Sequence, residues 1–78
     1  MPTLLNEGPY RFYFYSNESN EPPHIHIDRD MFSAKFWLEP VTLCKNIGFN
    51  SKELNKIYKI TIENQEYFIE RWNESFYI

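Results

Sequence analysis

Cysteine and glycine are scarce in this chain of 78 residues, which contains one cysteine and two glycines. Because Cys44 has no second cysteine to pair with, no disulfide can form within the chain, and no cysteine cluster can hold a structural zinc ion. The two glycines do not form the glycine-rich phosphate-binding loops of nucleotide-binding proteins. A single unpaired cysteine also favours a reducing compartment, the cytoplasm.

Long apolar runs and excess positive charge are also missing. No segment approaches the length of about 20 apolar residues that spans a membrane, and the N-terminus lacks the basic and apolar regions of a signal peptide. Lysine and arginine total 8 against 11 acidic residues, which gives a net charge of -3. This balance does not favour a broad nucleic-acid-binding surface. We therefore predict a soluble cytoplasmic protein that does not associate with membranes.

Aromatic residues, in contrast, are abundant and make up 19% of the chain. A domain of this size buries only about 60% of the surface that its unfolded chain exposes. Aromatic side chains that one small core cannot hide often mark an interface. We therefore expect a protein partner, either a second copy or a cognate small protein.

Local patterns predict one α+β domain over residues 1–78, in which a three- to four-stranded antiparallel sheet packs on one long C-terminal helix. An arm over residues 1–9 precedes a sheet region over 10–45, and the helix covers 50–77. Aromatic content and strict alternation predict strands over 10–15, 24–28 and 33–38. Residues 41–45 are consistent with either a short fourth strand or a turn of helix.

The helix has a clear start and no visible interruption. Asn50 is suited to cap it, and Glu53 stands where it can complete a capping box. Apolar residues then recur at helical spacing, and neither proline nor glycine follows Asn50. These features predict one helix of about six to seven turns.

Alternation along the strands divides the sheet into two faces. Ile25 and Ile27 point to one side, as do the apolar residues of the other two strands, and this side is expected to pack on the helix. The other side, which we call the open face, has no helix left to cover it and must meet water, a partner or a ligand. Its residues are Arg11, Tyr13, Tyr15, His24, His26, Asp28, Lys35 and Trp37.

His24 and His26 are the only histidines and point the same way from one strand. Three interpretations are open. They can belong to a structural or interface hydrogen-bond network, which we favour. They can act as a catalytic general acid and base, since imidazole titrates near neutral pH. They can also bind a divalent metal with Asp28 as a third ligand, and Glu18 or Glu21 of the preceding loop can join such a site.

The other open-face residues suggest a binding surface. Tyr13, Tyr15 and Trp37, with Arg11 and Lys35, can stack on the bases of a single-stranded nucleic acid. The same residue types are also enriched at protein interfaces. Given the negative net charge, we favour a protein interface.

Several segments resemble the small prokaryotic family called domain of unknown function 4160. The resemblance lies in Tyr10–Phe12, Phe14–Glu18, Asn20–Ile27, Ala34–Leu38, Gly48–Phe49 and Arg71–Trp72. It spans nearly the whole chain, and its most distinctive part is the block of two prolines followed by His24 and His26. Met31 and Phe32 depart from the more polar pattern of the family, which suggests extra apolar surface there.

The resemblance implies a short bacterial, archaeal or phage protein that is often encoded beside a second small protein. Such gene pairs look like toxin–antitoxin modules. Three hypotheses follow: a component of a two-protein module that acts through its interface, a small hydrolase of ribonuclease type that uses His24 and His26, or a nucleic-acid-binding regulator. The resemblance assigns no catalytic residues, although it makes the two histidines stronger candidates than their spacing alone does.

Overall fold

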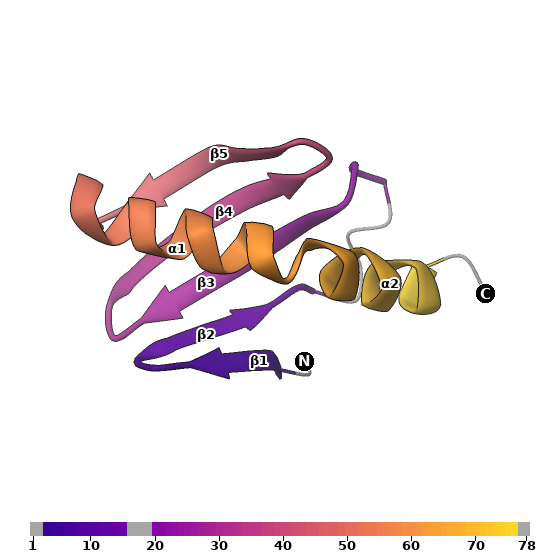
Figure 1. Ribbon diagram of the computed structural model, residues 1–78, viewed down its shortest axis with the longest axis horizontal. Helices are drawn as coiled ribbons and strands as arrows, with labels where there is room; N and C mark the ends of the chain where they lie inside the picture. The colour runs from indigo at the N-terminus through magenta and orange to yellow at the C-terminus, as the bar shows by residue number, and fades with distance from the viewer. Residues whose placement is uncertain (1–2, 16–19, 77–78) are drawn as a thin grey trace.

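A computed structural model of the chain describes residues 3–15 and 20–76. It contains a five-stranded antiparallel sheet and two helices, which confirms the α+β class (Figure 1). The elements in chain order are β1 (Thr3–Glu7), β2 (Tyr10–Tyr13), β3 (His24–Arg29), β4 (Phe32–Leu38), β5 (Val41–Ile47), α1 (Ser51–Glu63) and α2 (Gln65–Phe76).

The strands follow one another across the sheet in the order β1-β2-β3-β4-β5. The register places His26 of β3 between Tyr13 of β2 and Lys35 of β4. His24, at the start of β3, lies opposite Trp37. The register thus brings together open-face residues from the three central strands.

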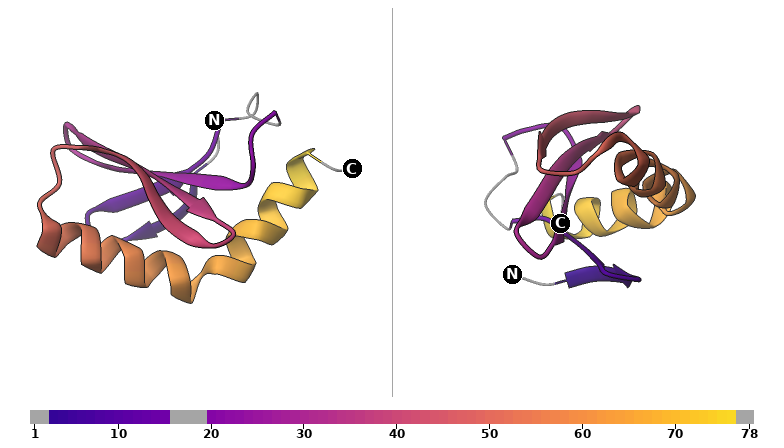
Figure 2. Two further views of the ribbon diagram at one scale, coloured as in Figure 1. Left: turned by 90° about the horizontal axis from the view of Figure 1, so that it is seen from above. Right: turned by 90° about the vertical axis from the view of Figure 1, so that its left-hand side faces the viewer.

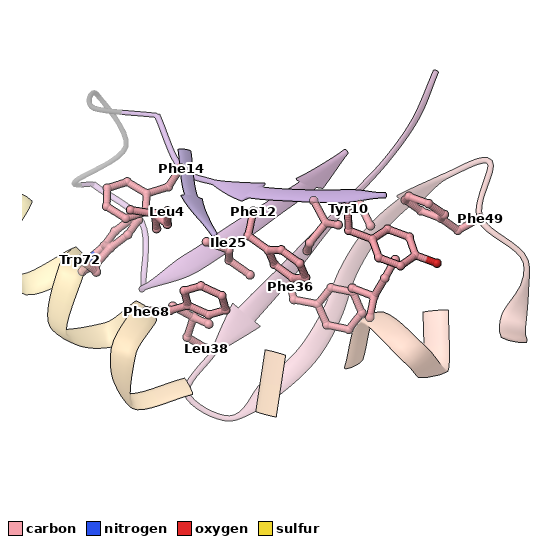
Figure 3. Close-up of a cluster of buried hydrophobic side chains, with 13 residues drawn as sticks. Leu4, Tyr10, Phe12, Phe14, Ile25, Phe36, Leu38, Phe49, Phe68 and Trp72 are labelled. Carbon is pink, nitrogen blue, oxygen red and sulfur yellow. The ribbon is translucent and has the colours of Figure 1, made fainter. Parts of the chain in front are cut away.

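Helix α1 lies along one face of the sheet, and α2 turns past the end of the sheet at which β3 begins (Figures 1 and 2). Ile25 and Ile27 of β3 are completely buried on that side, as the alternation predicted. Aromatic rings from the strands and from α2 fill much of this core, where Phe12 stacks on Phe68 and Phe14 meets Trp72 edge-on (Figure 3). Burial of such large apolar side chains is the main stabilising contribution in a small domain.

The helical segment is interrupted at Asn64, so the prediction of one continuous helix was wrong. The Asn64 side chain donates a hydrogen bond to the Ile60 carbonyl (2.8 Å), and the Thr61 hydroxyl donates one to the Ile57 carbonyl (2.8 Å). Such bonds compete with the regular helical pattern and bend helices. After the break, Gln65 Nε2 donates to the Leu38 carbonyl (2.6 Å), which fixes the start of α2 beside the end of β4.

The start of α1 is as predicted in one respect and different in another. The Asn50 side chain accepts a hydrogen bond from the Glu53 backbone N–H (2.9 Å), which confirms Asn50 as the N-cap. The Glu53 carboxylate, however, pairs with Arg29 on β3 (2.9 Å from Nε) and accepts a hydrogen bond from the Tyr10 hydroxyl (3.3 Å). Glu53 therefore ties the helix to the sheet.

The remaining differences lie at the two edges of the sheet. The predicted arm over residues 1–9 contains β1, an edge strand, and residues 41–45 belong to β5, the opposite edge. The sheet thus has five strands rather than three or four. Of the helix predicted over 50–77, residue 77 is outside the described part of the chain. Within that part, neither helix is long and apolar enough to cross a bilayer.

Candidate functional site: the open face of the sheet

His24 is the open-face residue whose position differs most from expectation, because its side chain is completely buried. Its ring lies 4.9 Å from the ring of Trp72 on α2 and 5.8 Å from that of Trp37. The break at Asn64 lets α2 reach the end of the sheet where β3 begins, so a helix does cover this part of the open face. The expectation that His24 is exposed was therefore wrong.

The His24 imidazole is also held by polar contacts. Its Nδ1 lies 2.9 Å from the carbonyl oxygen of Pro22. Because a carbonyl can only accept, Nδ1 must carry the proton in this bond. The Glu21 carboxylate lies 3.6 Å from the same nitrogen. Glu18, the other acidic loop residue considered for a histidine site, lies outside the described residues.

Tyr13 and His26 form the centre of the open face. Their rings stack at 5.4 Å, and the Arg11 guanidinium lies 4.5 Å from the centroid of the Tyr13 ring. Tyr15 meets His26 edge-on at 4.9 Å and is 40% exposed. Tyr13 is buried, whereas His26 and Tyr15 remain accessible.

The Tyr13 hydroxyl donates a hydrogen bond to Asp28 Oδ2 (2.9 Å). Burial of the ring, together with hydrogen bonds to Tyr15 and Asp28 and the negative charge of Asp28, raises the pKa of Tyr13 well above its ordinary value. The hydroxyl therefore keeps its proton at neutral pH. Asp28 Oδ1 is buried and has no hydrogen-bond partner in residues 3–15 and 20–76, so this oxygen can accept a further bond.

Lys35 and Trp37 extend the cluster onto β4. The Lys35 ammonium lies 4.8 Å from the centroid of the Trp37 ring and donates to Glu21 Oε1 (2.7 Å). His24 and His26 themselves meet edge-on at 5.2 Å. The structure thus joins the predicted open-face residues in one network and adds Glu21 to it.

A groove of about 470 Å³ crosses the open face from β2 to β5. Tyr13, Tyr15, His26 and Asp28 form one side of it. Lys35, also a predicted site residue, lines it as well. The remaining lining residues were not among the predicted ones and are Asp30, Met31, Phe32, Ser33, Ala34, Lys45 and Ile47. Met31 is 90% exposed, which agrees with the extra apolar surface expected at this turn.

The groove residues that sequence reasoning missed lie mainly on β5 and in the turn between β3 and β4. Lys45 was missed because the sequence of residues 41–45 is consistent with either a strand or a turn of helix. Ile47 was missed because no strand was predicted beyond residue 45. Ser33 shares the parity of Lys35 and Trp37, so alternation alone was enough to find it.

The predicted metal ligands His24, His26 and Asp28 do not form a ligand set in this geometry. Within the described ranges, no three or more His, Cys, Asp and Glu side chains gather so as to hold a metal ion. His24 Nδ1 is engaged with Pro22, and Asp28 Oδ2 with Tyr13. The positions of these three side chains therefore add no support to the prediction of a divalent metal cofactor.

Comparison with known proteins gives one match. No curated protein and no solved structure matches the chain. Residues 10–73 match the family described as Domain of unknown function (DUF4160). The matched range includes β2 to β5, α1, most of α2 and every open-face residue. The resemblance inferred from the sequence is thus confirmed, and the chain belongs to the DUF4160 family.

Proposed function

We propose that this protein is one component of a two-protein module of toxin–antitoxin type and binds its partner through the open face. The partner is the small protein encoded by the neighbouring gene. The observation that carries the proposal is the groove, in which accessible aromatic and apolar side chains lie beside two carboxylates and two lysines. The assignment to a two-gene module rests on the sequence resemblance alone.

The composition of the groove favours a protein partner over a nucleic acid. Asp28 and Asp30 line it together with Lys35 and Lys45, so the groove has no excess of positive charge to attract phosphate groups. Met31 at 90% and Ile47 at 50% exposure add apolar area of the kind that a protein surface covers.

Co-purification of the tagged chain with the product of the adjacent gene tests this proposal. We expect a stable complex, and Tyr15→Ala is expected to weaken it roughly tenfold or more, because an accessible aromatic anchor is lost. Glu70→Ala, an exposed change on α2, is the control and should leave binding unaltered. Failure of the two proteins to associate, or equal effects of the two variants, would contradict the proposal.

A hydrolase that uses His24 and His26 is the second candidate, favoured by one observation. The carboxylate of Glu21 and the carbonyl of Pro22 both approach His24 Nδ1, an arrangement that orients an imidazole for proton transfer. The complete burial of His24 opposes this role, since a substrate must reach the ring. Cellular toxicity that survives His26→Ala would eliminate the candidate.

The third candidate, a nucleic-acid-binding regulator, predicts retention on RNA or DNA at low salt and a steep loss of affinity as salt rises. The groove has no excess of positive charge, which makes this the least favoured reading. An absence of retention at low salt would remove it.

A further inference from the structure

β5 is an edge strand with an open outer side. In the described part of the chain it pairs only with β4, and all its residues except Val41 are exposed. Along such an edge, backbone N–H and C=O groups lack strand partners and can pair with an added strand.

A second, smaller groove of about 340 Å³ lies on the helix side of β5. Its apolar walls are Phe36 and Leu43 from the sheet and Leu54 and Tyr58 from α1. Leu43 is 42% and Tyr58 41% exposed, and Ile62 lies one turn farther along the same side of α1. A strand added to β5 would direct every second side chain into this groove.

Lysine side chains lie on both sides of the same edge. Lys45 points to the opposite side of β5, into the open-face groove. On α1, Lys52 and Lys59 flank Asn55, which lines the smaller groove. None of these three lysines forms an ion pair with any residue that the structure describes, whereas Arg29, Lys35 and Arg71 each have an acidic partner. The edge is thus complementary to an acidic segment.

A second copy of the chain fits this edge poorly. Antiparallel pairing of two β5 strands would bring Lys45 of each copy toward the other, and like charges at close range repel. The register of β5 also shifts between Leu43 and Lys45, and bulges and lysines at an edge discourage self-pairing.

We infer that β5 binds an extended acidic segment of the partner protein as an additional strand. Its apolar side chains enter the groove between β5 and α1, and the carboxylates at the alternate positions point to the other side of the sheet, toward Lys45. This inference rests on the proposed function, because β5 forms a wall of both grooves and one partner can then occupy both.

A peptide in which valine alternates with glutamate is the direct probe, with a lysine-containing counterpart as its charge-reversed control. We expect the full-length chain to bind the glutamate peptide more tightly, with slower hydrogen exchange of β5 amides. Tyr58→Ala and Lys45→Glu should each weaken binding roughly five- to tenfold. Lys56→Glu is the matched control, because Lys56 lies on the opposite flank of α1 near Pro9 and Tyr10. Equal binding of the two peptides, or equal effects of the two lysine variants, would overturn the inference.

The same variants separate this inference from the proposed function when the product of the adjacent gene is the ligand. Weaker binding by both Tyr15→Ala and Tyr58→Ala supports both. A loss with Tyr15→Ala alone retains the open face as the interface and rejects strand addition at β5. Binding that neither change affects rejects both, and dimerisation of the isolated chain through β5 also rejects strand addition.

Discussion

On the helix side of β3, Ile25 and Ile27 are completely buried against side chains of α1 and α2, whereas on the open side only His24 is completely buried and His26 is half-exposed. The first side is covered by a second layer of structure. The second is ordered by contacts between neighbouring side chains, with Trp72 covering one end. The comparison indicates that the helix side provides most of the stability, while the open face is an ordered and partly accessible surface.

The two tryptophans provide the largest contrast between the faces. Trp72 is completely buried against Phe14 of the core and His24, and Trp72→Ala is expected to lower the free energy of unfolding by about 3–5 kcal/mol. Trp37 is half-buried on the open face, so Trp37→Ala should cost only about 1–2 kcal/mol. Urea denaturation measures both, and equal losses would show that the two faces do not differ in this way.

The two histidines give a smaller contrast within the open face itself. His24→Ala removes buried packing against Trp72 and the bond to the Pro22 carbonyl, with an expected loss of about 2–3 kcal/mol. His26→Ala should cost about 1 kcal/mol, since its ring is half-exposed. If His26→Ala lowered the free energy of unfolding more than His24→Ala, the centre of the open face would contribute more to stability than its covered end, contrary to this expectation.

Alkaline pH tests how firmly the open face is packed. The pKa of Tyr13 is raised mainly by burial, and that of Tyr10 by burial and by Glu53, so both stay protonated in the folded chain when the unfolded chain ionises. These two tyrosines should therefore leave the unfolding free energy unaffected below about pH 10. Above that pH, each should lower it by up to about 1.4 kcal/mol per pH unit. Denaturation at increasing pH measures this slope. Tyr13→Phe should reduce it, and an unchanged slope would show that Tyr13 ionises normally.

Met31 should give the smallest effect on stability and sharpen the distinction between stability and binding. Because it is 90% exposed, Met31→Ser should change the unfolding free energy by less than about 0.5 kcal/mol. The same change removes an apolar side chain from the rim of the groove and should weaken binding of the product of the adjacent gene. A lower free energy of unfolding together with unchanged binding would contradict this expectation.

Features that depend on local alternation were predictable from the sequence. Ile25 and Ile27 were placed in the core, and the open-face residues were placed together, because a strand has a period of two. Asn50 was identified as a helix cap from another local signal, the residue types at positions 50 and 53. The strand register, and hence the contact between Tyr13 and His26, requires knowledge of pairing that alternation does not supply.

The features that were missed depend on longer-range contacts or on weak local signals. β1 has no aromatic residue and only one β-branched residue, Thr3, and β5 follows a proline that obscures its start. Asn64 interrupts the helix through side-chain hydrogen bonds, without the proline or glycine that usually signals a break. The burial of His24 follows from that interruption, so one unrecognised bend accounts for the main error about the site.

The central claim is that the open face binds the partner. Its most direct test is to compare side-chain NMR signals of the chain with and without the product of the adjacent gene. The account predicts large shifts for the rings of Tyr15 and His26 and for the Met31 methyl group, with little change for exposed residues of α2 such as Glu70. Binding that shifts α2 signals and leaves those three side chains unchanged would contradict it.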